Sequence, residues 1–194
     1  MPSMTTKDAV FQSRRHWSPY GAVAPPIDLL DISRYKQTSL FINNTAWAQL
    51  ASGLWVLTFD GTGDTVVFAA SLVPVQTFIT WIYPTVKNRS IVDFDAGTHS
   101  IETTNATPPL LTATGWTAPV IYVNGQIAST VITLDIWQMI AITTATSFIM
   151  SALVLGQEAS DYAGKLGLPR CYNYALNADQ INSIYAKERS WFDV

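Results

Sequence analysis

Residues 168–192 read LPRCYNYALNADQINSIYAKERSWF, and this stretch decides the fold because a strand pattern turns into a helix pattern within it. Asn177 is a favourable N-cap, since its side chain can accept a hydrogen bond from a free amide of the first helical turn. Gln180 lies three residues later, where its side chain can bond back to the cap, as in a capping box. Apolar residues then recur at helical spacing, at Ile181, Ile184 and Tyr185. We therefore expect one short helix near the end of the chain.

The sequence before this helix is typical of short β-strands. About a dozen short runs follow Thr38, many of them rich in β-branched and aromatic residues, and turn residues separate them. The Asn124-Gly125 pair is the strongest hairpin signal, because a type I′ turn needs positive φ at both central residues. Alternation within residues 80–83 places successive side chains on opposite faces of a strand. The pattern predicts an all-β fold, a two-sheet antiparallel jelly-roll sandwich with one short C-terminal helix.

Three segments resemble motifs of laminin-G-like domains, which belong to the concanavalin A-like lectin/glucanase superfamily. The first segment is the closing strand and helix with a Trp-led strand before it, and its matching residues are Trp137, Gly156, Gly164, Leu166, Tyr172, Asn173, Ala175, Leu176, Gln180, Ile181, Ile184 and Tyr185. The second is residues 53–68, similar to an F-D-G-x-x-D-x-V strand, and the third is the Y-V-N-G hairpin within residues 121–129. The resemblance implies the sandwich fold. It implies no single function, because this fold hosts lectins, glycosidases and adhesive modules.

Composition and charge exclude several classes of function. The 194 residues suit one domain, with 48% hydrophobic and only 13% charged residues. The net charge is −3, and Lys87 and Arg89 are the only lysine or arginine residues between positions 37 and 164, so the chain lacks the basic stripe of a nucleic-acid-binding protein. No stretch is long and apolar enough to span a membrane. The single cysteine, Cys171, is expected to be a small buried residue in a strand.

The first 36 residues differ from the rest of the chain. They contain a small basic cluster, a Pro25-Pro26 pair that favours an extended path, and little periodicity. We expect residues 1–36 to form an extended N-terminal arm and residues 37–194 to form the jelly-roll domain. Two interpretations of the arm are open: a partly ordered tail, or an arm that docks on a neighbouring subunit through Trp17 and Tyr20.

The N-terminus lacks the apolar segment of a secretory signal. Because the domains that the chain resembles usually act outside cells, we expect synthesis in the cytoplasm followed by display on a virion or another extracellular surface. The low charge fits sheet faces that contact protein neighbours in a homo-oligomer or a virion. It fits a threonine-rich β surface equally well.

The superfamily contains glucanases, whose catalytic carboxylates lie on one strand as E-x-D-x-x-E. Retaining glycosidases need two carboxylates about 5 Å apart. This chain has three glutamates, Glu102, Glu158 and Glu188, and none of them opens that motif. Asp93 and Asp95 share a strand face at i, i+2, but no glutamate lies beside them. We therefore expect no enzymatic activity and assign no catalytic residue.

Three aspartates are candidate calcium ligands. Asp60 and Asp64 flank a glycine-rich turn, and Asp161 lies in the loop QEASDYAG. Related domains often use aspartates at the rim of the sandwich, and calcium prefers oxygen ligands that converge from loops. The alternative is that Asp60 and Asp64 only form turns, by accepting hydrogen bonds from nearby backbone amides.

A lectin site combines an aromatic platform with Asn, Asp or Gln side chains. Most of the seven tryptophans and eight tyrosines are expected in the core. Trp116 lies in the polar, turn-like stretch ATGWTAP, and we expect it to be exposed as a platform for a ligand. Asn105 and Tyr162 are the accompanying ligand-binding candidates, and the sequence does not show whether they lie near Trp116.

These observations favour a non-catalytic structural or adhesion module displayed on a surface, such as the exterior of a phage or virus, that binds glycan or neighbouring subunits. The alternative is a monomeric carbohydrate-binding lectin, with or without calcium. A glycoside hydrolase comes third. The mass in solution separates the first two interpretations, because a structural subunit is expected to form an oligomer.

Overall fold

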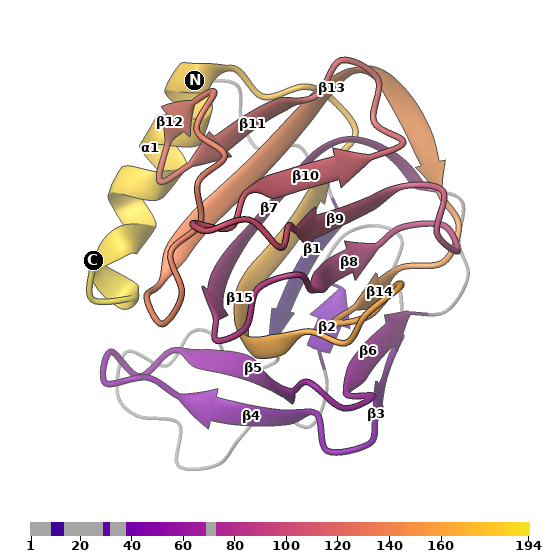
Figure 1. Cartoon of the computed structure of the whole chain (residues 1–194). Coiled ribbons are helices and arrows are strands. Elements are labelled where there is room, and N and C mark those ends of the chain that lie inside the picture. Colours follow the sequence, from indigo (N-terminus) through magenta and orange to yellow (C-terminus); the bar gives the residue numbers. More distant parts are fainter. Residues whose placement is uncertain (1–8, 14–28, 32–37, 69–72) are drawn as a thin grey trace.

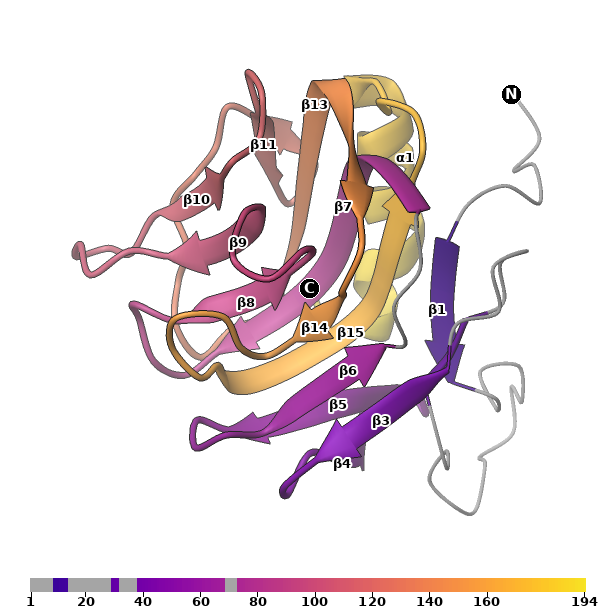
Figure 2. The same ribbon diagram turned by 90° about the vertical axis from the view of Figure 1, so that its right-hand side faces the viewer.

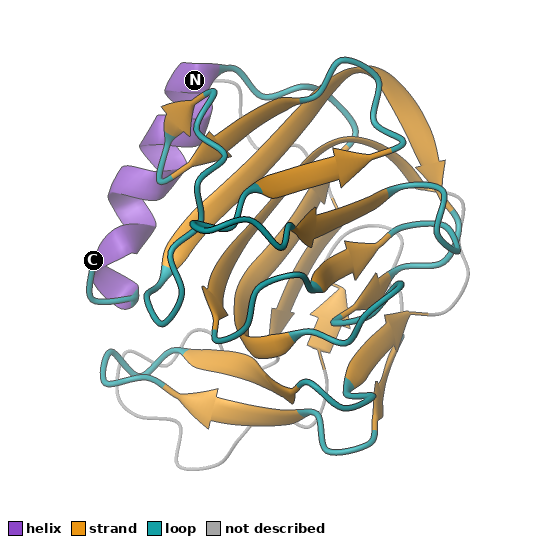
Figure 3. Cartoon of the chain, viewed as in Figure 1, coloured by secondary structure: helices purple, strands orange, loops and turns teal. Residues whose placement is uncertain are grey.

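The computed structural model describes residues 9–13, 29–31, 38–68 and 73–194. Trp17 and Tyr20, the expected docking residues of the arm, lie outside these described residues. Short strands dominate the fold, and an α-helix follows the last of them (Figures 1 and 3). The elements are β1 (Ala9–Ser13), β2 (Leu29–Asp31), β3 (Ser39–Ile42), β4 (Ala46–Gln49), β5 (Trp55–Asp60), β6 (Thr65–Phe68), β7 (Val73–Pro84), β8 (Ser90–Asp93), β9 (Ser100–Thr103), β10 (Leu111–Thr114), β11 (Val120–Val123), β12 (Gln126–Ile127), β13 (Gln138–Met150), β14 (Val154–Leu155), β15 (Ala163–Tyr172), α1 (Ala178–Glu188) and the 3-10 helix η1 (Arg189–Trp191).

The strands form two antiparallel sheets packed face to face, which confirms the predicted fold class. The six-stranded sheet has the order β10-β9-β8-β14-β6-β3. The nine-stranded sheet has the order β12-β11-β13-β7-β15-β1-β2, and β5 also pairs with β15, with β4 beyond it. Each pairing between these strands is antiparallel. Tight turns join only some of these neighbours, such as β11 and β12, whereas the central neighbours β13, β7 and β15 lie far apart in the sequence.

Alternation along the strands divides the apolar residues between two layers. In β7, Phe78 and Ile82 belong to the core between the two sheets, where Phe78 packs edge-on against Phe94 with ring centroids 5.2 Å apart. Ile79 and Trp81 of the same strand belong to a second apolar cluster, on the outer face of the nine-stranded sheet. Neighbouring residues of a strand face opposite ways, so one strand supplies both clusters.

Helix α1 covers part of the outer face of the nine-stranded sheet (Figure 2). The predicted capping box is present: Asn177 Oδ1 accepts from Gln180 N–H at 2.9 Å, and Gln180 Oε1 accepts from Asn177 N–H at 3.0 Å. Ile181 is fully buried on the sheet side of the helix. No helix of the described residues has the length and apolar character that a bilayer crossing requires.

A buried ion pair fastens the end of α1 to the sheet. The Glu188 carboxylate accepts from both terminal nitrogens of Arg170, at 2.5 and 2.8 Å, and from Trp81 Nε1–H at 2.9 Å. Burial acts to lower the pKa of Arg170, but the Glu188 carboxylate more than offsets this effect, so the pKa is raised and the guanidinium stays charged. We refer to Trp81, Arg170 and Glu188 as the helix anchor.

Two local expectations have opposite outcomes. The hairpin turn is confirmed, since Asn124 and Gly125 have φ of 52° and 78°. The run STVITL at residues 129–134 is one of the short β-branched runs whose pattern predicts a strand, and that prediction is wrong, because only Val131 makes an isolated bridge there. The Gln138 side chain accepts from Thr133 N–H at 3.2 Å and donates to Thr133 O at 2.8 Å. A side chain thus satisfies backbone groups that a neighbouring strand would otherwise bind.

Two strands of the expected arm belong to the nine-stranded sheet. In the pairing of β1 with β15, Ala9 lies opposite Cys171 and Val10 lies opposite Arg170, and β2 pairs with β1 in turn. Cys171 is 1% exposed, as expected for a small buried residue. The division of the chain at residue 36 stays a prediction.

Candidate functional site

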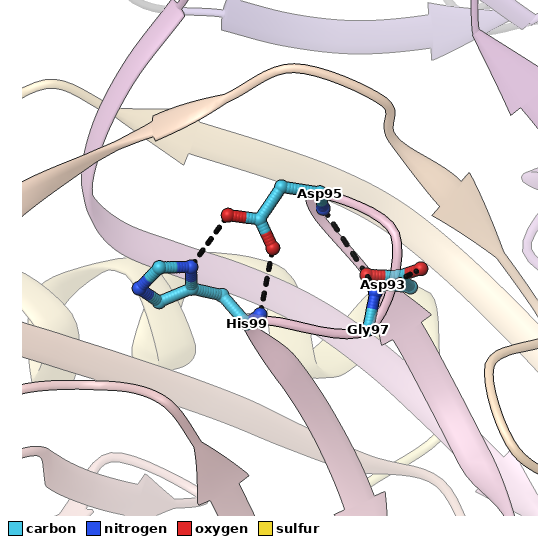
Figure 4. Close-up of polar contacts among 4 residues, drawn as sticks. All are labelled: Asp93, Asp95, Gly97 and His99. Carbon is cyan, nitrogen blue, oxygen red and sulfur yellow. Dashed lines mark hydrogen bonds and ion pairs between the residues drawn. The ribbon is translucent and has the colours of Figure 1, made fainter.

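The turn between β8 and β9 holds a compact group of polar side chains (Figure 4). Asp93 ends β8, and its carboxylate accepts from the backbone N–H groups of Asp95 at 3.1 Å and of Gly97 at 2.9 Å. Gly97 has φ of 90°, a left-handed conformation that favours glycine. The sequence Asp-Phe-Asp-Ala-Gly therefore builds a tight turn that holds Asp95 beside His99.

Asp95 binds His99 twice. One carboxylate oxygen lies 2.6 Å from His99 Nδ1, and the other accepts from the backbone N–H of His99 at 2.7 Å. An ionised carboxylate can only accept, so Nδ1 carries the shared proton. No atom of the described residues hydrogen-bonds to Nε2, the other ring nitrogen, and the His99 side chain keeps 18% of its surface exposed. His99 therefore has one polar atom available to a ligand.

The ring of His99 lies on an aromatic layer. It stacks on Phe148 with centroids 4.0 Å apart and planes at 5°. Phe148, which is half-buried, contacts Trp116 edge-on at 4.9 Å and Phe94 at 5.5 Å. Trp116 and Phe94 belong to the core between the sheets, so the stack of His99 on Phe148 is the part of this aromatic group that reaches solvent.

Three loops meet at this end of the sandwich. The turn at 94–99 contacts the β10–β11 connection at Gly115, where an added Cβ would collide with Thr98 O and lie 3.1 Å from His99 Cδ2. The irregular middle of β13, where its pairing with β7 shifts register between Thr143 and Phe148, supplies the third loop. Thr144 Oγ1 donates to Thr117 O at 2.6 Å and so ties that loop to the β10–β11 connection. We call Asp95, His99 and Phe148 with these loops the His99 site.

Polar side chains line the exposed part of the His99 site. Its exposed rim carries small hydroxyl side chains, Thr114, Thr117, Thr146 and Ser147. An Asp–His pair also orients the general base of many hydrolases, but such a base needs a nucleophile within hydrogen-bond reach. No hydroxyl or thiol of the described residues hydrogen-bonds to the His99 ring. The described residues thus place no side-chain nucleophile against His99.

The predicted ligand-binding residues do not form one site. Trp116 was expected to be exposed, and this is wrong: it keeps only 6% of its surface because Phe94 and Phe148 pack against it. Tyr162 is fully buried beside Phe59, and this burial raises the pKa of its phenol well above the ordinary value. Asn105 is exposed, but it follows β9, whereas His99 precedes that strand.

The three predicted calcium ligands do lie around one turn, between β5 and β6. Asp64 is 1% exposed and accepts from the N–H groups of Asn44 at 2.8 Å and Asp60 at 2.9 Å. Asp161 accepts from Gly63 N–H at 2.9 Å, and Asp60 accepts from Thr62 N–H. These contacts correspond to the alternative in which the aspartates form turns. In the described part of the chain, no three His, Cys, Asp or Glu side chains converge to hold a metal ion.

Sequence reasoning missed His99 and Phe148 as site residues. The local signal was present, because the aspartates of 93–95, a glycine at 97 and a histidine at 99 suit a polar turn. The partner ring of Phe148 comes from β13, which pairs in the other sheet. No sequence spacing predicts that contact, so the stack emerged only from the fold.

No known protein family matches the chain, and no curated protein matches it significantly. Solved structures do share its fold. Domain 4 of AbnA, a GH43 extracellular arabinanase from Geobacillus stearothermophilus, in complex with arabinotriose, has 14% identity and a TM-score of 0.54, over 77% of this chain and 88% of that one. The binding domain of Paraclostridial Mosquitocidal Protein 1 has 11% identity and a TM-score of 0.62, over 92% of this chain and 51% of that one. The botulinum neurotoxin serotype D ligand-binding domain in complex with N-acetylneuraminic acid has 9% identity and a TM-score of 0.59, over 94% and 51%.

The chain spans about half the length of these toxin binding domains, and most of the arabinanase domain. Likeness at such low identity shows a shared β-sandwich fold and nothing finer. Membership of the laminin-G-like group therefore stays an expectation from the sequence.

Proposed function

We propose that this protein is a non-catalytic carbohydrate-binding β-sandwich and that the His99 site holds the sugar. The stack of His99 on Phe148, with Nε2 unused and Asp95 fixing the ring, is the observation that carries the proposal. Sugars bind through C–H groups packed on aromatic faces and through hydroxyls paired with fixed polar atoms. A half-buried aromatic layer with one oriented ring nitrogen provides both kinds of contact.

Two of the structural neighbours support a sugar as the ligand. One was solved in complex with arabinotriose and another in complex with N-acetylneuraminic acid. The shared fold favours a sugar as the ligand. The position of the site rests on this chain's own residues.

The state of the carboxylates supports a non-catalytic role. Glu102 accepts from Ser100 Oγ at 2.7 Å, Glu158 lies 3.4 Å from Ser90 Oγ, and Glu188 is buried in the helix anchor. Asp93 and Asp95 are both occupied by turn amides. A glycosidase needs a pair of carboxyl groups that face the substrate, with one of them free to act as an acid.

The proposal is tested by a glycan array followed by calorimetric titration of any hit. His99→Phe keeps a ring on Phe148 but removes Nε2, and we expect affinity to fall about tenfold or more. Asn105→Ala is the matched control, because it removes an exposed polar side chain beyond the other end of β9. An array without hits would refute sugar binding. Equal affinities for wild type and His99→Phe would show that the sugar binds at another site.

Display as an assembled surface subunit is a second proposal. It is favoured by large exposed apolar side chains on terminal strands of both sheets, Leu40 on β3 at 62% and Ile127 on β12 at 59%. Side chains of this kind are common at contacts between subunits. Light scattering of the full chain tests the proposal: an oligomer that Leu40→Ser or Ile127→Ser converts to a monomer supports assembly, and a monomeric wild type argues against it.

A further inference from the structure

We infer that the His99 site selects uncharged sugars and rejects acidic ones, an inference that rests on the proposed sugar-binding function. Two independent features support it. One is the distribution of fixed charge around the site, and the other is the hydrogen-bonding character of the single free ring nitrogen.

Fixed charge at the site is negative. The sequence has no lysine or arginine between residues 90 and 164, the segment that supplies the turn at 94–99, the β10–β11 connection and the irregular part of β13. The same turn carries two carboxylates: Asp93 accepts from Asp95 N–H at 3.1 Å, and Asp95 accepts from His99 N–H at 2.7 Å. A carboxylate or sulfate on the ligand would therefore meet a segment whose side chains charged at neutral pH, His99 apart, are carboxylates.

The nearest cations along the chain are too far from the His99 site to make its fixed charge positive. Lys87 and Arg89 precede β8, and Asp93 ends it. Four residues of extended strand separate Arg89 from Asp93, which is about 13 Å. The Debye length at physiological ionic strength is about 8 Å, so solvent screens most of that positive charge. Lys87 is also directed to Thr107, to which its Nζ donates at 2.8 Å.

The free ring nitrogen also favours uncharged sugars over acidic ones. Because Asp95 accepts a hydrogen bond from Nδ1–H, the tautomer that this contact selects has its lone pair on Nε2. A sugar hydroxyl can donate to this acceptor, whereas an ionised carboxylate or sulfate has no proton to donate. Asp95 cannot turn away to change the tautomer, because its second oxygen is held by the backbone N–H of His99 at 2.7 Å. Asp95 is thus a positioning residue that makes the site an acceptor.

The test compares matched neutral and acidic probes on the full chain. Lactose and 3′-sialyllactose form one pair, and arabinotriose and trigalacturonate extend the set, beside an array that contains both classes. We expect the hits to be neutral, with an acidic counterpart bound about tenfold more weakly or worse. Raising NaCl from about 50 mM to about 500 mM should strengthen binding of the acidic counterpart and leave the neutral sugar unchanged, because salt screens the repulsion.

Two charge-neutralising variants complete the experiment. Asp95→Asn removes one carboxylate and lets the new amide donate to Nδ1, which makes Nε2 the protonated atom. We expect the ratio of the affinity for the neutral sugar to the affinity for its acidic counterpart to fall at least about threefold. Asp60→Asn makes the same chemical change in the exposed β5–β6 turn and should leave the preference unchanged. Acidic hits that are lost in His99→Phe would overturn the selectivity while upholding sugar binding, whereas an absence of any hit would overturn the proposed function itself.

Discussion

The helix anchor and the His99 site are both built around a carboxylate, but they differ in whether a polar atom stays accessible to a ligand. In the helix anchor, the two oxygens of Glu188 accept from Arg170 and Trp81, and Glu188 is only 7% exposed. In the His99 site, Asp95 is equally occupied, yet its partner ring retains one nitrogen without a bond inside the described protein. The helix anchor is buried, including Arg170 Nε, which has no hydrogen-bond partner, whereas the His99 side chain keeps part of its surface in solvent.

This difference separates a structural role from a binding role. A buried carboxylate that has all its partners inside the protein stabilises an arrangement and has nothing to offer a ligand. A ring that a carboxylate orients, and that still has a free hydrogen-bonding nitrogen on its exposed edge, is pre-organised to bind a ligand. Substitutions in the two centres should therefore affect different quantities, stability in the first and affinity in the second.

Removing the carboxylate of the helix anchor should have the largest effect on stability. Glu188→Ala leaves the Arg170 guanidinium buried without its counter-ion and Trp81 Nε1 without its acceptor. We expect the free energy of unfolding to fall by about 3–5 kcal/mol in urea titrations. The neighbouring exposed change Lys187→Ala should alter it by less than about 0.5 kcal/mol. A loss below about 1 kcal/mol for Glu188→Ala would mean that the anchor is not what holds α1.

The β5–β6 turn should give an intermediate effect. Asp64→Ala removes the acceptor for two backbone N–H groups, those of Asn44 and Asp60, in a position that is 1% exposed. We expect a loss of about 1–3 kcal/mol in the same titration, the usual cost of unsatisfied buried donors. Asp60→Ala should cost less, because Asp60 is exposed. Equal losses for both variants would show that burial does not decide the effect.

A change within the His99 site should affect binding more than stability. Phe148→Leu keeps an apolar side chain against Trp116 but removes the flat ring under His99. We expect a loss of less than about 1.5 kcal/mol in stability, together with about a tenfold loss of affinity for the best sugar found. A large loss of stability with unchanged affinity would place Phe148 with the structural residues.

Calcium should have the smallest effect. Asp60 and Asp64 of the β5–β6 turn, and Asp161 beside it, already accept from backbone or side-chain N–H groups. We therefore expect Tm to change by less than about 1 °C between calcium and EDTA in a thermal melt. A clear rise of Tm with calcium, lost in Asp161→Asn, would restore the metal-site interpretation.

Much of the architecture could be predicted because its signals are local. The capping box at Asn177 and Gln180, and the positive φ values of Asn124 and Gly125, depend on residues at most three positions apart. The alternation in residues 80–83 likewise places Trp81 on the helix side and Ile82 in the core. The strand predicted at 129–134 does not form, and the Gln138 side chain binds Thr133 N–H and Thr133 O in place of a neighbouring strand.

The candidate site could not be predicted in the same way. A polar, turn-like neighbourhood suggested exposure for Trp116, but exposure depends on what packs against a side chain. Phe148 arrives from the opposite sheet and covers Trp116, and His99 then lies on Phe148. The sequence did place three aspartates in loops, and only the hydrogen bonds revealed that backbone amides occupy them.

The sheet-forming pattern, the turns, the closing helix and the lack of lysine and arginine between residues 90 and 164 can all be recognised in the sequence. These properties follow from composition and from contacts between residues a few positions apart. Long-range packing determines which carboxylates are buried with their partners and which ring keeps a hydrogen-bonding nitrogen exposed. That outcome depends on long-range contacts, such as Arg170 with Glu188 beneath α1 and His99 with Phe148 between two sheets, and burial and pairing exist only once those segments meet.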